Sequence, residues 1–295
     1  RTCRLKMAHD AAQFRHLAAA GVAVNRFTAL ADLYQDALHR IPWPADDSAP
    51  MDVPADWRDR LAESTNRPLH LAPAPEVATA VNPALDVAAV VESFGAGAPA
   101  MAVIDDLLTP GALAGLRRYL LDSTIWYDFT HIGGFLAAYL EDGMACPLLL
   151  QIGAELRRRL PGLLGAHGPC QVWAFKCLTG DRGIDVHADA GAISINFWIT
   201  PDGANLEPGG SGLVIHGAPP PAGWALSDYH GDIGEIRRFL ADDPARAVTV
   251  PYAENRAVLF RSDLFHESAP VKFRPGYENH RINITLLFGD QPRDL

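Results

Sequence analysis

The chain has 295 residues, of which 48% are hydrophobic, so it can bury the core of one large domain or of one domain plus an extension. Its formal net charge of −10 disfavours nucleic acid as a partner, because phosphate backbones attract basic surfaces. No run of about 18 apolar residues predicts a membrane span. The four cysteines lack CxxC spacing, as is typical of reduced thiols in a cytoplasmic protein.

The N-terminal quarter of the chain is predicted to be helical and then irregular. Apolar residues recur at helical spacing over 7–20 and 27–40, and Pro42 ends the second pattern. From 43 to 83 the sequence is rich in Pro, Ala and Asp, with one possible short helix. We interpret residues 1–83 as a helical and irregular extension packed on the main domain, although a linker has the same composition.

The main domain is predicted to span residues 84–295 and to begin with a helical segment over about 85–94. A strand near Met101 is followed by Thr109-Pro110, a typical helix start. A loop with a helical turn is expected over 126–143, and helical spacing returns over 148–160.

His187 and Asp189 form the first candidate site. They lie between two apolar segments, 172–178 and 192–199, whose β-branched and aromatic residues predict strands. In extended backbone the side chains of residues i and i+2 point the same way, so both can reach one ion. A chance occurrence is also expected for so short a motif in a chain with 11 histidines, and the strand context is what favours a site here.

A second His-x-Asp, His230 to Asp232, lies in a long insertion at 219–250. Asp232 opens a helical pattern and has Glu235 three residues later, so it is better explained as a helix N-cap. Long loops inside compact domains tend to be functional, and we expect this insertion to act as a lid over the site and help select the substrate. Its candidate contact residues are Trp224, Tyr229, His230 and Arg237.

Two downstream residues complete the candidate site. His266 follows a predicted strand at 255–260, where a ligand can point into the mouth of a barrel, although a partly buried structural histidine fits as well. Arg281 opens a strand in which Arg281, Asn283 and Thr285 share one face. Two imidazoles and one carboxylate leave open positions on a metal, an arrangement that suits non-haem Fe(II).

The order His187-x-Asp189, His266 and then Arg281 resembles that of the Fe(II)/2-oxoglutarate-dependent oxygenases, over roughly residues 100–295. The resemblance is greatest to the phytanoyl-CoA-hydroxylase-like and related bacterial branches. It implies an α+β fold, with a double-stranded β-helix (a jelly roll) flanked by helices.

The resemblance also implies roles for individual residues. His187, Asp189 and His266 would hold Fe(II), and Arg281 would pair with the distal carboxylate of 2-oxoglutarate; Arg274, in a nearby turn, is the alternative anchor. Lys176 and Trp198 match positions that line the co-substrate pocket in this branch, with Asn196 a weaker candidate. Their alternative interpretations are an edge lysine and a core tryptophan.

The implied activity uses O₂ and 2-oxoglutarate to hydroxylate an unactivated C–H bond, with release of succinate and CO₂. Asp189 argues for hydroxylation or a related outcome, because the related halogenases carry a small residue there. The substrate is expected to be a small molecule or a group bound to a carrier or peptide. A cupin-type Zn²⁺ or Mn²⁺ enzyme and a non-catalytic module that binds 2-oxoglutarate or metal are the alternatives.

Overall fold

The structure is a computed structural model that describes residues 1–130, 133–180, 183–221, 223–224, 233–241 and 247–290. The helices are α1 (Arg4–Ala19), α2 (Val24–Arg40), α3 (Ala55–Leu61), α4 (Val87–Ala96), α5 (Pro110–Asp122), α6 (Pro147–Arg159), α7 (Pro161–Leu164) and α9 (Ile233–Ala241). Short 3-10 helices are η1 (Leu140–Asp142), η2 (Asp202–Ala204) and η4 (Tyr277–Asn279). The strands are β1 (Met101–Ile104), β2 (Phe135–Tyr139), β3 (Pro169–Cys177), β4 (Gly191–Trp198), β5 (Leu213–Ile215), β6 (Val248–Val250), β7 (Ala257–Arg261), β8 (His266–Ser268) and β9 (Ile282–Asp290).

The strands form two antiparallel sheets. The larger has the order β1-β7-β4-β9-β3-β2, and the smaller has the order β6-β5-β8. One row of directly paired residues crosses four strands of the larger sheet: Tyr139, Trp173, Thr285 and Asn196. Paired residues of an antiparallel sheet point to the same face, so this row lines one surface. The structure therefore confirms the mixed α+β class.

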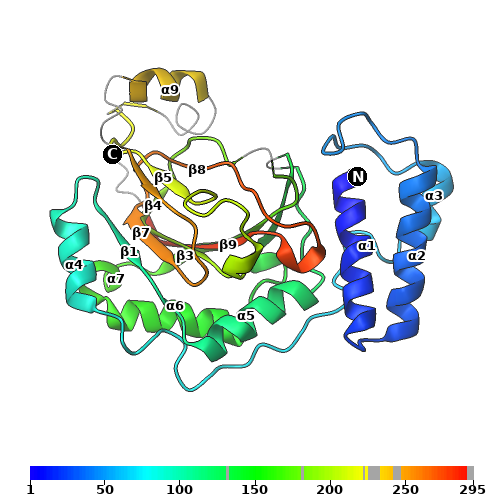
Figure 1. The fold of residues 1–295 in the computed structure, drawn as a ribbon, viewed down its shortest axis with the longest axis horizontal. Coiled ribbons are helices and arrows are strands. Elements are labelled where there is room, and N and C mark those ends of the chain that lie inside the picture. Colours follow the sequence, from blue (N-terminus) through cyan, green and yellow to red (C-terminus); the bar gives the residue numbers. More distant parts are fainter. Residues whose placement is uncertain (131–132, 181–182, 222, 225–232, 242–246, 291–295) are drawn as a thin grey trace.

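Helices cover the other face of the larger sheet (Figure 1). Leu120 of α5 and Ile152 of α6 belong to the same buried cluster as Ile195 and Ile284 of the sheet. Alternation from Arg281 through β9 places Ile284 on the helix side and Arg281, Asn283 and Thr285 on the cavity side, as the period of two predicts. A separate cluster that includes Trp198, Leu213, Ile215 and Phe260 joins residues of the larger sheet to those of the smaller.

Helices α1 and α2 pack side by side at the end of the molecule opposite α4 (Figure 1). Together with α3 they have their own core, which includes Phe14, Phe27, Tyr34 and Trp57. Helix α1 begins three residues before its predicted start because the Sγ atom of Cys3 accepts a hydrogen bond from the backbone N–H of Lys6. Cysteine is not among the residues that signal a helix N-cap, so the sequence did not indicate this start.

The prediction for residues 126–143 was incomplete. The helical turn is present as η1, but residues 135–139 form strand β2 at the edge of the larger sheet. Ala137 and Ala138 carry no strand preference, and the strand exists through its pairing with β3. None of the helices within the described residues is long and apolar enough to cross a lipid bilayer.

Candidate metal centre and adjoining cavity

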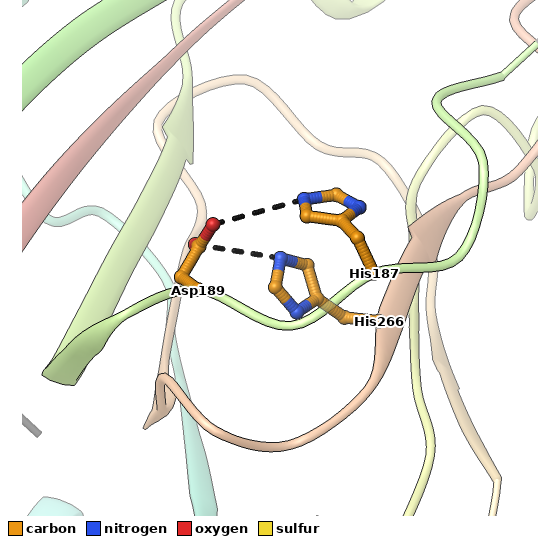
Figure 2. Close-up of side chains that lie close together, drawn as sticks. All are labelled: His187, Asp189 and His266. Carbon is orange, nitrogen blue, oxygen red and sulfur yellow. Dashed lines mark ion pairs between the residues drawn. The ribbon is translucent and has the colours of Figure 1, made fainter. Parts of the chain in front are cut away.

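Three predicted ligands converge on one point (Figure 2). The ligand atoms of His187, Asp189 and His266 all lie within 4.8 Å of one another. Nε2 of His187 is 3.8 Å from one carboxylate oxygen of Asp189, and Nε2 of His266 is 3.6 Å from the other. These separations leave room for an ion between the three groups.

Backbone pairing brings the two histidines together. The N–H of His187 donates to the carbonyl of His266 at 3.0 Å, and the reverse bond measures 2.8 Å. Nearby, the N–H of Asp189 donates to the carbonyl of Ser262 at 2.9 Å. The segment before β4 is thus held against the segment that leads into β8. These bonds fix the backbone positions from which all three side chains extend.

Each imidazole is oriented by its second ring nitrogen. Nδ1 of His187 lies 2.7 Å from the carbonyl oxygen of Asp185, and Nδ1 of His266 lies 2.9 Å from that of Leu264. A carbonyl only accepts hydrogen bonds, so Nδ1 carries the proton and Nε2 presents its lone pair toward the other ligands. This is the usual arrangement around histidines that bind metals.

The donor set fits a divalent transition metal. Two neutral imidazole nitrogens and one carboxylate, with the remaining positions open, suit Fe(II) and are also acceptable to Zn²⁺ and Mn²⁺. His266 and Asp189 are buried, and Ser194 donates to Asp189 at 3.4 Å. The residues present therefore fit a bound metal ion.

The metal centre borders a cavity of about 610 Å³. One part of its wall is polar and comes from β4, from β9 and from the residue just before β9, with Asn196, Asn283, Thr285 and Arg281. Another part is aromatic and comes from β2 and β3, with Tyr139, Trp173 and Phe175. The cavity thus offers a polar region and an aromatic region beside the same ligand set.

Arg281 is 2% exposed, and within the described residues no carboxylate lies within ion-pair distance of it. Burial lowers the pKa of its guanidinium from 12.5 to about 10. Among the residues that the structure describes, its buried Nε atom has no hydrogen-bond partner, and Nη1 has a long contact of 3.5 Å with Asn283. A buried, unpaired guanidinium is costly, and an anionic ligand in the cavity would remove that cost.

Two further predicted residues, Trp198 and Asn196, also have buried polar atoms that find no hydrogen-bond partner among the described residues. The centre of the Trp198 indole ring lies 5.6 Å from the Arg281 guanidinium carbon, and its Nε1 has no hydrogen-bond partner in the described part of the chain. Asn196 donates to Thr285 at 3.2 Å, while its Oδ1 is buried and unpartnered. Asn196 and Arg281 both line the cavity, whereas Trp198 is buried in the cluster between the two sheets and is not among the lining residues.

Lys176, which was predicted to line the co-substrate pocket, is not among the residues that border this cavity. Phe175 borders the cavity, and Lys176, the next residue of β3, points to the opposite face. Its Nζ atom lies 3.1 Å from Nε2 of His9 in α1 and 3.3 Å from the hydroxyl of Tyr277. The sequence resemblance located the strand, but the face depends on which side the second sheet covers.

The other candidate residues are dispersed. Arg274 is exposed and does not line the cavity, which favours Arg281 as the anion-binding arginine. Trp224 packs against Phe265, 6.2 Å between ring centroids, and is not a cavity residue. Arg237 is half exposed and paired with Glu267. The predicted lid residues Tyr229 and His230 lie outside the described residues.

Sequence reasoning assigned no role to several cavity residues. Asn283 and Thr285 had been placed on the Arg281 face of β9, so the period-two pattern was a sufficient signal for them. Trp173 and Phe175 follow the same alternation on β3. Tyr139 had no usable signal, since its strand was not predicted.

No protein-family model matches the chain, and no curated protein matches it. Among solved structures, it is similar to HygX from Streptomyces hygroscopicus with nickel and 2-oxoglutarate bound, at 12% identity over 69% of this chain and 87% of that one, with a TM-score of 0.48. It is also similar to a prolyl hydroxylase from Trichoplax adhaerens in complex with a hypoxia inducible factor peptide, at 16% identity over 70% and 89% of the two chains, with a TM-score of 0.47. A third is the epimerase SnoN from nogalamycin biosynthesis in complex with Fe³⁺ and alpha-ketoglutarate, at 12% identity over 69% and 83%, with a TM-score of 0.47. The function proposed below therefore rests on the geometry of the site.

Proposed function

We propose that the chain is a non-haem Fe(II)- and 2-oxoglutarate-dependent oxygenase whose two sheets form a double-stranded β-helix. One observation carries the proposal. The metal-binding set of His187, Asp189 and His266 shares a cavity with Arg281, a buried guanidinium that has no carboxylate partner within the described residues. A ligand that chelates a metal and also carries a carboxylate would bind the metal centre and neutralise Arg281 at the same time.

2-Oxoglutarate has the required chemistry at its two ends. Its keto acid end can chelate a metal through two oxygens, and its distal carboxylate matches the planar fork of Arg281. Asn196 in the same cavity wall offers a buried acceptor, and Trp198 beside Arg281 offers a buried donor, and both atoms lack a hydrogen-bond partner among the described residues. Their roles would be to orient the co-substrate rather than to transfer protons.

Bound Fe(II), with 2-oxoglutarate and O₂, would supply the oxidising power to convert a C–H bond to C–OH, releasing succinate and CO₂. The residues of the chain hold the participants and exclude water. Both histidines direct Nε2 toward the shared metal position, because their Nδ1 atoms are bonded to backbone carbonyls. Buried Phe260 and Phe175 line the cavity and limit its hydration.

The primary substrate would occupy the aromatic region. Tyr139 and Trp173 are directly paired across β2 and β3, and both are partly exposed while lining the cavity. Such a wall suits an apolar or ring-bearing group, since aromatic faces bind it through area and stacking. Backbone bonds between Asp128 and Ala137 occupy the middle of the outer edge of β2, which disfavours a peptide bound there as an added strand.

A cupin-type Zn²⁺ or Mn²⁺ enzyme would use the same three ligands, but it gives no reason for an unpaired buried arginine in the cavity. A non-catalytic module that binds 2-oxoglutarate would explain Arg281 equally well. Turnover is the property that separates this alternative from the oxygenase.

The test combines spectroscopy with product analysis. Anaerobic addition of Fe(II) and 2-oxoglutarate should produce a weak visible metal-to-ligand band, and His266→Ala should abolish it. Exposure to air should then yield succinate, and a cell extract should show a compound heavier by one oxygen atom. Absence of the band would overturn the proposal, and the band without succinate would indicate a binding module.

A further inference from the structure

Helix α9 packs against the chain segments that carry the metal ligands. Ile236 is fully buried in a cluster with Val186, Ala188 and Phe265. The rings of Phe239 and Phe265 add a contact of 6.0 Å between centroids. The three residues that share this buried cluster with Ile236 are each adjacent in sequence to a metal ligand.

The alternation of side chains shows which surface α9 covers. Val186 and Ala188 flank His187 and alternate with the ligands, and Phe265 directly precedes His266. In extended backbone, adjacent side chains point to opposite faces. Helix α9 therefore packs behind Ala188 and Phe265, on the face opposite the metal centre. Val186 of the ligand-bearing segment and Ile233 of the helix lie at the margin of this support and also line the cavity.

One cation of α9 connects the two ligand-bearing segments. The guanidinium of Arg237 lies 2.8 Å from a carboxylate oxygen of Glu267 and 3.9 Å from one of Asp185. Glu267 follows His266 in the chain, and the backbone carbonyl of Asp185 is the group that orients the ring of His187. Both imidazoles are thus adjacent to residues that Arg237 contacts.

We propose that Ile236 and Arg237 are positioning residues, which set the separation of His187, Asp189 and His266 from behind and thereby determine metal affinity. The proposal rests on the function proposed above only in taking the three residues as metal ligands. It gives the described part of the insertion a supporting role in place of the predicted covering role. Partners that orient metal ligands typically change metal affinity by about 10- to 100-fold when removed.

A positioning role predicts effects that a merely structural role does not. Arg237 is half exposed, so its ion pairs contribute little to the stability of the metal-free chain. Removing its charge should therefore weaken metal binding while leaving thermal unfolding of the metal-free chain nearly unchanged. Arg238 is the matched control, since it is an exposed arginine on the same helix and takes no part in this contact.

The experiment measures the Kd of Co(II) for the full chain by its visible absorption. Arg237→Met, which keeps an apolar stem, should raise the Kd at least about tenfold, and Arg237→Lys should restore part of the affinity. Ile236→Ala should act in the same direction, whereas Arg238→Met should match the wild type. Because Arg237 is at the surface, its variant tests the idea even where Ile236→Ala fails to fold.

An unchanged Co(II) Kd in Arg237→Met would overturn the positioning role, as would an equal loss in Arg238→Met. Failure of the proposed oxygenase function looks different. In that case the wild type binds Co(II), His266→Ala abolishes binding and the Arg237 effect persists, but no succinate forms with Fe(II), 2-oxoglutarate and air.

Discussion

Nζ of Lys176 lies 3.1 Å from Nε2 of His9, which joins the first helix of the chain to the sheet that bears the candidate site. Nδ1 of His9 lies 3.0 Å from Asp10, so Nδ1–H donates to the carboxylate and Nε2 accepts from Lys176. Nζ of Lys176 also lies 4.3 Å from the centre of the Trp126 ring, and burial lowers the pKa of this lysine well below its usual value. This buried contact requires a neutral imidazole at His9.

The neutral state of His9 leads to a pH-dependent stability. Burial, assisted by the charge of Lys176, lowers the pKa of His9 from 6.5 to about 3. Between these values the unfolded chain binds more protons than the folded chain at this residue, so the free energy of unfolding falls as the pH drops through this window. The contribution of His9 reaches at most about 1.4 kcal/mol per pH unit.

Urea unfolding of the wild type and of His9→Gln between pH 7 and pH 4 measures this contribution. The variant should show the shallower dependence, because glutamine does not titrate. His39→Gln, at an exposed histidine of α2, should keep the wild-type slope. Equal slopes for the wild type and His9→Gln would contradict the prediction.

Arg281→Met should have opposite effects on the stability of the metal-free chain and on its affinity for 2-oxoglutarate. The metal-free chain should become more stable, by about 1–3 kcal/mol, because a buried guanidinium without a carboxylate partner is replaced by an apolar group of similar length. Binding of 2-oxoglutarate should weaken by about 2–5 kcal/mol, at least about 30-fold. Thermal unfolding and calorimetric titration measure the two effects.

Arg274→Met is the control for this pair of measurements, since Arg274 is exposed and outside the cavity. It should change neither the affinity for 2-oxoglutarate nor the unfolding temperature appreciably. A loss of affinity in Arg274→Met with none in Arg281→Met would reverse the assignment of the anchor.

Metal binding should stabilise the folded chain. A ligand that binds only the folded state at about 100 times its Kd adds about 2.7 kcal/mol to the free energy of unfolding. Co(II) should therefore raise the unfolding temperature of the wild type, and a chelator should reverse the increase. His187→Ala, Asp189→Ala and His266→Ala should each lose the response, and a full response in any of them would remove that residue from the ligand set.

Trp173→Ala should affect the primary substrate and not the co-substrate. The indole lines the aromatic region of the cavity and has no role in holding the metal or Arg281. We expect the amount of oxidised product per succinate to fall at least about tenfold, with the affinities for Co(II) and 2-oxoglutarate nearly unchanged. Trp173→Phe, which keeps an aromatic face, should retain most of the coupling. Unchanged coupling in Trp173→Ala would place the substrate elsewhere.

The sequence alone was sufficient for the local part of the site. The period of two places His187 with Asp189, and Arg281 with Asn283 and Thr285, because alternation is a property of extended backbone itself. The sequence also predicted most of the described helices to within a few residues, since helical spacing and the Thr109-Pro110 start are local signals.

Only the tertiary structure decided which surfaces face the cavity. Alternation sets Phe175 and Lys176 on opposite faces of β3 but does not say which face the second sheet covers, and Lys176 lies on the helix side. Strand β2 exists through its pairing with β3, and α9 supports the ligands from behind through Ile236 and Arg237. These features depend on contacts between segments far apart in the chain, and such contacts leave no periodic signal in either segment.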